Sequence, residues 1–189
     1  MLGKKDFLLF IVFIAVIALS RFMPHPWNFT PVGALAIFGG AIYKNRRSAI
    51  FFTFLALYLT DFILNNFVHR GSFTGQTGII WFSNYMIWVY GGFAAMFLIA
   101  NNVLRRFSYS KLIFGSLAGS VAFFMITNFG SWLFFDLYTK DFTGLISSYI
   151  NGIPFFKYTI LGDLVYSVGI FFVYNKVTEK ANVKNLAYA

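Results

Sequence analysis

The sequence predicts an all-α integral membrane protein, a compact bundle of six transmembrane helices that forms a single domain over residues 1–189. Hydrophobic residues make up 59% of the chain and charged residues only 11%, which lies outside the range of soluble domains. Apolar runs recur along the whole chain and leave no room for a separate soluble domain. The basic residues fall in short clusters between these runs, which is typical of topology signals.

Six apolar runs approach the ~20 residues that a spanning helix needs. They cover residues 7–20, 31–43, 48–67, 79–100, 112–135 and 154–174. The first run follows two lysines and ends in small residues, so a cleaved signal peptide is an alternative for it. A retained first span agrees better with the charge distribution. The chain has no cysteine, which excludes a disulfide framework and a thiolate nucleophile.

The positions of lysine and arginine predict the orientation. The segments assigned to one side carry Lys4, Lys5, Lys44, Arg46, Arg47, Arg105, Arg106, Lys111, Lys176, Lys180 and Lys184. The other side carries Arg21, Arg70, Lys140 and Lys157. The positive-inside rule then places both termini in the cytoplasm of a bacterial cell, with a multi-pass chain in the cytoplasmic (inner) membrane. The net charge of +9 reflects this pattern, and no nucleic-acid partner is expected.

The second run is too short to cross a bilayer. It follows the irregular outer loop RFMPHPWNFT, and Thr30 and Pro31 are suitable residues for a helix start. About 13 residues at 1.5 Å each reach only ~20 Å, whereas the hydrocarbon layer is ~30 Å thick. We therefore expect the loop to dip into the protein, with the helix N-terminus aimed at a site.

Two other outer loops are candidate lids over that site. Residues 69–78 are polar and glycine-rich. Residues 141–152 are expected to form a short amphipathic helix across the outer face.

Polar side chains inside the predicted spans gather in the outer half. Charged groups at membrane depth are costly and often functional, which draws attention to Asp61 and Asp163. Asn65 lies four residues after Asp61 and so shares its helix face. The same helical spacing groups Trp81 with Asn84 and Asn128 with Trp132. A cavity that opens to the outside and is closed below would have this distribution.

Structural roles are the alternative for several of these residues. Asp61 and Asp163 could pair with Arg21 or His25 and hold helices together. The two histidines do not form a metal site, and no cofactor is expected. An intramembrane hydrolase would have only the two aspartates as a catalytic pair, with no motif around them, so the sequence does not favour an enzyme.

Three stretches carry a resemblance to a known family. They are RFMPHPWNFTPVGALAIFGGA, GSLAGSVAFFMITNFGSW and GIPFFKYTILGDLVYS, at residues 21–41, 115–132 and 152–167. Together the chain resembles an uncharacterised bacterial family of membrane transport proteins, similar to the substrate-binding S components of energy-coupling factor (ECF) transporters. The resemblance covers nearly the whole chain.

The resemblance implies a substrate-binding subunit for uptake of a vitamin or similar micronutrient. Such a subunit works with a transmembrane coupling protein and two cytoplasmic ATPases. By the resemblance, the pocket residues are Arg21, His25, Asn28, Asp61, Asn84, Asn128 and Asp163. S components often carry an Ala-x-x-x-Ala docking motif in the first span, whereas Ala15 and Ala18 have the wrong spacing here.

The small residues of GSLAGSVA in the fifth run either pack inside the bundle or present a smooth face to a partner protein. A small structural or assembly subunit of a larger membrane complex, without a small-molecule substrate, is thus the alternative function. For the transport hypothesis, the aromatic residues suit a flat heterocycle such as a flavin, a pterin or a corrinoid. Arg21 and the helix start at Thr30 favour a carboxylate or phosphate on that ligand.

Overall fold

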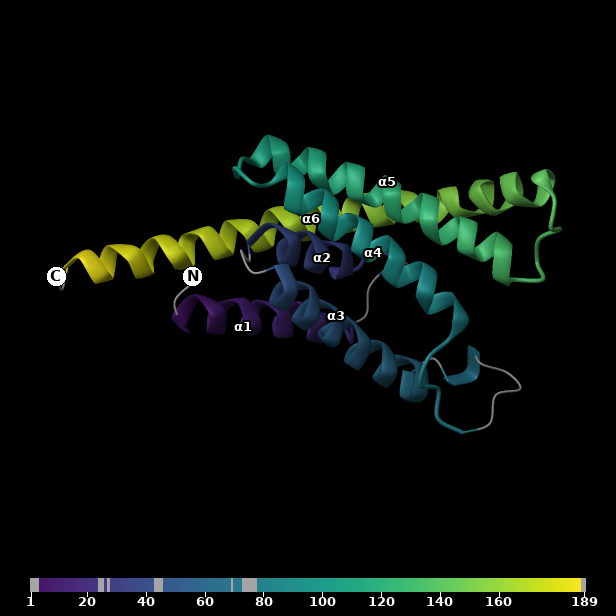
Figure 1. Cartoon of the computed structure of the whole chain (residues 1–189), viewed down its shortest axis with the longest axis horizontal. Helices are drawn as coiled ribbons and strands as arrows, with labels where there is room; N and C mark the ends of the chain where they lie inside the picture. Colours follow the sequence, from purple (N-terminus) through teal and green to yellow (C-terminus); the bar gives the residue numbers. More distant parts are fainter. Residues whose placement is uncertain are drawn as a thin grey trace.

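The structure is a computed structural model that describes residues 4–23, 26, 28–42, 46–68, 70–72 and 78–187. All regular structure in these residues is helical, and they contain no strand. The elements are α1 (Lys4–Ser20), α2 (Val32–Ile42), α3 (Arg46–Ile63), the π-helical turn η1 (Leu64–Val68), the 3₁₀ turn η2 (Arg70–Ser72), α4 (Asn84–Val103), α5 (Tyr109–Phe134) and α6 (Phe142–Ala187). Figure 1 shows them as one elongated bundle.

Four of the described helical segments are long and apolar enough to cross a membrane. They cover Arg47–Val68, Asn84–Val103, Tyr109–Phe134 and Phe142–Thr178. Their outward faces carry exposed apolar side chains, such as Val121 and Met125 on α5 and Val165 and Phe172 on α6. Apolar residues on the outside of a helix bundle are expected where lipid replaces water. The chain is therefore an all-helical membrane protein.

α2 is the short helix at the centre of the bundle. It has 11 residues, and all of those from Val32 to Gly40 are buried. It contacts all five of the other α-helices. Gly39 lies against the Thr53 side chain of α3, and Gly40 lies against the backbone of Phe97 in α4. Because protein surrounds it on all sides, α2 can end inside the membrane without exposing its backbone to lipid.

The sequence placed the start of α2 within one residue. The first helical hydrogen bond runs from the Leu35 N–H to the Pro31 carbonyl (2.9 Å), so Pro31 caps a helix that begins at Val32. The preceding backbone at Phe29 and Thr30 lies against Gly162, well inside α6. The outer loop thus reaches the middle of the bundle at its last residues, as its composition indicates.

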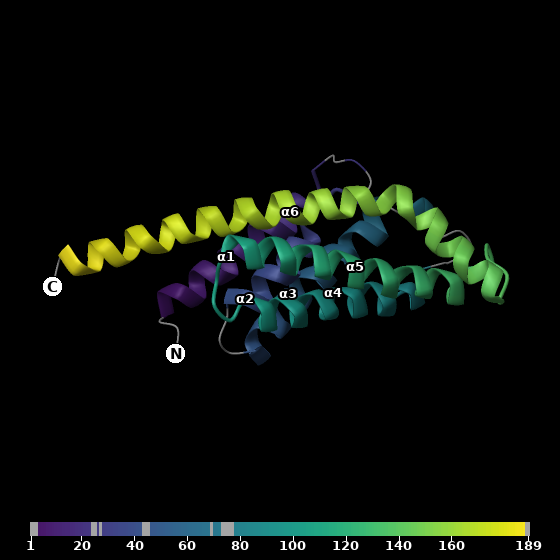
Figure 2. The same ribbon diagram turned by 90° about the horizontal axis from the view of Figure 1, so that it is seen from above.

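Helices α4 and α6 begin at other residues than the sequence predicts. Residues 79–83 are not helical, and α4 starts after Ser83, whose extended backbone makes it the N-cap. Residues 142–152, predicted as a separate short helix, are the first turns of α6. Pro154 lies inside α6. It removes one backbone hydrogen bond and bends the helix without ending it. Figure 2 shows the bend in the light green part of α6.

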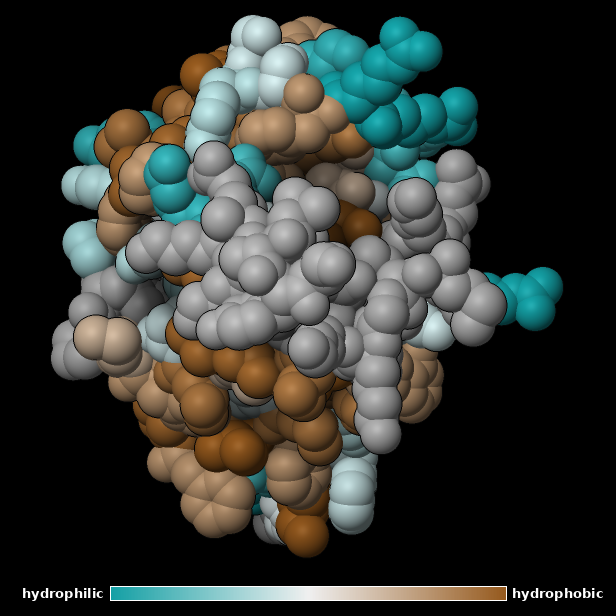
Figure 3. Space-filling model, turned by 90° about the vertical axis from the view of Figure 1, so that its left-hand side faces the viewer, coloured by the Kyte–Doolittle hydropathy of each residue, from teal (hydrophilic) through white to brown (hydrophobic). Residues whose placement is uncertain are grey.

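The end of the bundle that holds both termini is closed by an apolar core. Phe38 of α2 contacts the rings of Phe13, Phe171 and Tyr174. Phe38, Phe97, Leu112 and Phe171 are completely or almost completely buried. Seen from this end, hydrophilic side chains stand at the upper and left edges of the molecule (Figure 3).

The small residues of α5 pack inside the bundle. Gly119 lies against the Met96 side chain at 3.3 Å from the position of a Cβ, and Gly115 lies against Val103 at 3.7 Å. Both partners belong to α4. The glycine pair therefore brings α4 and α5 close together.

Candidate functional site

A cavity of about 480 Å³ lies between α2, α4, α5 and α6. Its aromatic lining consists of Tyr85, Phe93, Phe123, Phe124, Tyr138, Phe155 and Phe156. Its polar lining consists of Arg21, Asn28, Thr30, Thr127, Asn128, Ser131, Asn151, Thr159 and Asp163. A volume of this size falls within the range of ~300–1,000 Å³ for small-molecule sites, which combine apolar walls with a few polar groups.

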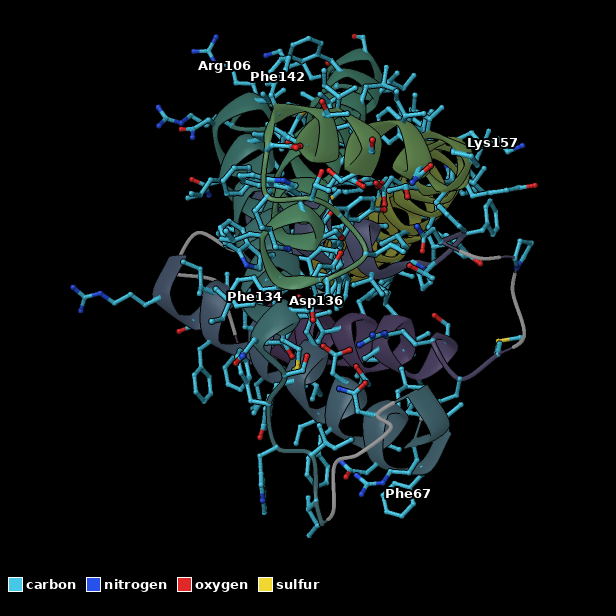
Figure 4. The ribbon with its side chains drawn as sticks, turned by 90° about the vertical axis from the view of Figure 1, so that its right-hand side faces the viewer. Phe67, Arg106, Phe134, Asp136, Phe142 and Lys157 are labelled. Carbon is cyan, nitrogen blue, oxygen red and sulfur yellow. The ribbon has the colours of Figure 1, made fainter. Side chains whose placement is uncertain are left out.

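The cavity occupies the half of the bundle that lies away from the two termini. Its lining comes from the first part of α4, the last part of α5, the first part of α6 and the N-terminus of α2. These helix parts meet at the end where α3 leads to α4 and α5 leads to α6 (Figure 1). Figure 4 looks onto this end, with Asp136 and Phe134 near the middle of the view and Phe67, Phe142 and Lys157 around it.

The lining residues follow helical spacing on each wall. On α6 they include Asn151, Phe155, Thr159 and Asp163, each four residues after the last, with Gly152 and Phe156 beside them. On α4 they are Tyr85, Val89, Phe93 and Met96. One stripe of each helix thus faces the cavity, and the opposite stripe faces lipid.

Asp163 is the deepest charged group of the lining and has an exposed fraction of 2%. The Ser120 hydroxyl of α5 donates a hydrogen bond to its Oδ2 (2.6 Å). The same hydroxyl lies 2.9 Å from the Ser116 carbonyl, and its single proton can serve only one of the two acceptors. No lysine or arginine among the described residues forms an ion pair with Asp163.

Gly33, in the first turn of α2, allows the close approach of Asp163. A Cβ at this position would lie against the Asp163 Oδ1, 2.6 Å from its Cγ and 2.8 Å from the Met96 Cε. The carboxylate therefore lies beside the N-terminus of α2, where backbone N–H groups lack intrahelical partners and the helix dipole is positive.

Arg21 lines the cavity, but its charge is paired elsewhere. Its Nη2 forms an ion pair with the Asp61 Oδ1 (2.5 Å), and its Nη1 donates to the Thr60 hydroxyl. The Tyr90 hydroxyl of α4 donates to the other carboxylate oxygen of Asp61 (2.7 Å). Arg21, Asp61 and Tyr90 thus tie the end of α1 to α3 and α4. The sequence left Arg21 and His25 open as partners of the aspartates, and the structure pairs Arg21 with Asp61.

Asn128 places its carboxamide between α5 and α6 at the cavity wall. Its Nδ2 donates to the Phe124 carbonyl (2.8 Å). Gly152 of α6 brings its backbone against the same side chain, because a Cβ there would lie 2.8 Å from the Asn128 Cγ. Asn28 also lines the cavity, from a left-handed backbone conformation (φ 61°) that asparagine tolerates better than most residues.

Asp61 and four further predicted binding residues within the described part of the chain do not line the cavity. Asn65 donates to the Met86 sulfur (3.8 Å), and Asn84 is the exposed first residue of α4. Trp81 is 63% exposed and contacts the Phe62 ring. The Trp132 Nε1 donates to the Thr139 carbonyl (2.9 Å). His25 lies outside the described residues. A binding role for these six residues stays a prediction.

The sequence analysis missed several lining residues, chiefly Asn151, Tyr138, Tyr85 and Thr159. The four-residue repeat from Asn151 to Asp163 was a detectable signal. The sequence predicts a last span that starts at Pro154. Asn151 then lies outside the helix that carries Asp163, and the repeat is interrupted. The phenylalanines gave no signal, since 27 of them are spread over the chain.

The connection between α5 and α6 is held in place by hydrogen bonds. The Lys140 ammonium donates to the carbonyls of Trp132 and Phe135 (both 2.7 Å). Asp141 caps α6 by accepting from the Gly144 N–H (2.7 Å) and the Thr139 hydroxyl (2.8 Å). The Gly144 hydrogen bond is the main reason why the pKa of Asp141 lies below its ordinary value. Residues 141–152, predicted as a lid, are the cap and first turns of α6, and a lid role for them stays a prediction. Most of the other predicted lid, residues 69–78, lies outside the described residues.

Comparison with known proteins gives a family and nothing beyond it. A family model described as a family of unknown function, DUF6580, matches residues 2–186. No curated protein and no solved structure matches the chain.

Proposed function

The chain belongs to the family of unknown function DUF6580, and we propose that it is the substrate-binding membrane subunit of an uptake system for a vitamin or similar micronutrient. The observation that carries this proposal is the cavity of about 480 Å³ with aromatic walls, a deep carboxylate and the Asn128 carboxamide. A cavity that combines aromatic walls with a few polar groups is typical of a small-molecule site.

The proposal includes an S-component-like bundle of six spans, with α1 and the buried α2 as the two short ones. It places both termini in the cytoplasm and the cavity toward the outside of a bacterial inner membrane. In support, the exposed Arg47, Arg105, Arg106, Lys111 and Lys176 lie at or near the helix ends that share the side of the termini. Basic residues are enriched in cytoplasmic segments.

Active uptake needs energy from partner chains. The sequence has no phosphate-binding loop of an ATPase, and its 189 residues are accounted for by the helices and short connections. We therefore assign ATP hydrolysis to separate cytoplasmic subunits, joined through a transmembrane coupling protein. This protein itself would bind its substrate without chemical change, as a non-enzymatic subunit.

The alternative is an assembly subunit without a small ligand, for which Gly115 and Gly119, packed against α4, do not supply the contact face. Native mass spectrometry of the protein, gently solubilised from its host membrane, separates the two functions. A retained small molecule, with or without ATPase chains, is the expected result. A defined protein complex that holds no small molecule would favour the assembly subunit and reject the transport proposal.

A further inference from the structure

Both features that would attract an anionic ligand already lie beside a carboxylate of the protein. The Arg21 guanidinium is paired with Asp61 at 2.5 Å and also bonds to the Leu57 carbonyl (3.3 Å). The N-terminus of α2 has the Asp163 carboxylate against its first turn, at Gly33. A carboxylate or phosphate of the ligand at Arg21 or at the helix start would therefore meet a carboxylate that is already there, and such binding stays a prediction.

The deepest charged group of the cavity, Asp163, accepts fewer hydrogen bonds than a buried carboxylate usually does. Asp163 lies 98% out of solvent contact, and the described hydrogen bonds bring it only the Ser120 hydroxyl, which the Ser116 carbonyl also attracts. A buried carboxylate commonly accepts several hydrogen bonds, and a missing donor is costly. A ligand that brings an N–H group to the Asp163 Oδ1 would satisfy it.

The walls near this carboxylate suit a flat ring. The Phe124 and Phe156 rings are stacked at 4.4 Å between centroids, and Phe93 and Phe123 lie 4.7 Å apart. All four line the cavity. Aromatic faces favour stacked rings and also attract cations. The volume of about 480 Å³ admits a heterocycle of one to three rings.

From these observations we infer that the cavity takes a small aromatic heterocycle whose inner end is an N–H donor, neutral or positively charged, bound to Asp163. An ionised Asp163 repels a ligand that places a carboxylate or phosphate at that depth. This inference deepens the proposed function and rests on it.

A matched set of probes tests the charge preference. Tryptamine, tryptophol and indole-3-acetate share one ring system and are cationic, neutral and anionic at pH 7. Dissociation constants would be measured with the detergent-solubilised full chain after retained small molecules have been removed. We expect tryptamine to bind at least about tenfold more tightly than indole-3-acetate, the effect of one charge-assisted hydrogen bond.

Two variants test whether the Asp163 side chain causes the preference for tryptamine over indole-3-acetate. Asp163→Asn should weaken tryptamine binding by about tenfold or more and remove the difference between the two charged probes. Asp136→Asn, an exposed aspartate in the α5–α6 connection, should keep it. If Asp163→Asn does not fold, the order of affinities in the unsubstituted protein still decides the matter.

Three results would overturn the inference. They are indole-3-acetate binding as tightly as tryptamine, an unchanged preference in folded Asp163→Asn, and no binding of any probe at millimolar concentration. If native mass spectra nevertheless show a retained small molecule, the proposed function stands and only the ligand class is wrong. If they show none, the proposed function fails and this inference fails with it.

Discussion

At the scale of single residues, the fold depends on a glycine beside a buried carboxylate. Gly33 leaves no space for a side chain, since a Cβ would lie 2.6 Å from the Asp163 Cγ and 2.8 Å from the Met96 Cε. An added methyl group must displace the carboxylate, the methionine or α2 itself. A change at Gly33 would thus affect both the packing of α2 and the position of Asp163 in the cavity wall.

Gly33→Ala should therefore lower the free energy of unfolding by about 1–3 kcal/mol, the usual cost of overpacking, and weaken retention of a ligand. Gly169→Ala is the matched control in α6, where a Cβ has no neighbour within 4 Å. Alanine there should be neutral or slightly stabilising, by up to about 1 kcal/mol. Thermal unfolding in detergent measures both, and equal effects of the two changes would contradict the packing account.

The Arg21–Asp61 pair is the second feature that single residues can test. Each side chain is 15% exposed, so the pair is neither fully solvated nor fully buried. In a double-mutant cycle of Arg21→Gln and Asp61→Asn, we expect a coupling energy of about 1–2 kcal/mol. Additive effects on the unfolding free energy would show that the pair does not hold α1 to α3. Tyr90→Phe supplies a reference for the other hydrogen bond of Asp61.

At the scale of elements, the cap of α6 gives a pH dependence with a defined sign. The Gly144 N–H and the Thr139 hydroxyl hold the pKa of Asp141 below its ordinary 3.8, with a smaller opposite effect from desolvation. A lowered pKa in the folded state means that the cap stabilises the protein above the ordinary pKa. That contribution is lost as the pH falls below about 3.8 toward the folded pKa.

Asp141→Asn should remove this part of the pH dependence, because an amide does not titrate in this range. The unfolding temperature of the variant should fall less between pH 5 and pH 3 than that of the unsubstituted protein. The effect is small, since the group is fully exposed. Asp136→Asn is the control in the same connection, and an identical change in that variant would remove Asp141 as the cause.

The positions of the helices could be predicted where the apolar runs end at caps or basic residues. Pro31 and the polar loop before it marked α2 within one residue, and its shortness correctly indicated a helix surrounded by protein. The prediction that α6 starts at Pro154 was wrong. A proline can bend a helix that continues on both sides of it, and here packing and the N-cap before Pro154 keep α6 intact. Because the predicted helix started too late, Asn151 was not predicted as a site residue.

The candidate site was predicted in outline from its buried polar groups. Asn128 and Asp163 line the cavity because a polar residue in an apolar run must face protein. The partners of the aspartates could not be predicted, since the choice between Arg21 and His25 depends on how α1, α3 and α6 are arranged. The aromatic residues of the cavity wall could not be predicted either, because phenylalanine faces both lipid and the cavity in this chain.

At the scale of the whole molecule, the proposed orientation can be tested without background labelling, because the chain has no cysteine. Arg106→Cys lies after α4 on the side of the termini, and Asp136→Cys lies after α5 on the side of the cavity. Both native residues are exposed. In cells with an intact inner membrane, an impermeant maleimide should label Asp136→Cys and spare Arg106→Cys until the membrane is opened. The reverse pattern would invert the topology and turn the cavity toward the cytoplasm.

The central claim is that the cavity holds a small molecule, and its most direct test is ligand retention in a variant that changes only the wall. Native mass spectra would be recorded for the unsubstituted protein, Asn128→Leu and the matched control Asn102→Leu, whose native residue is exposed on α4 outside the cavity. The account predicts one retained small molecule in the unsubstituted protein and in Asn102→Leu, and its loss from a folded Asn128→Leu. Equal retention in all three proteins would place the ligand elsewhere and contradict the account.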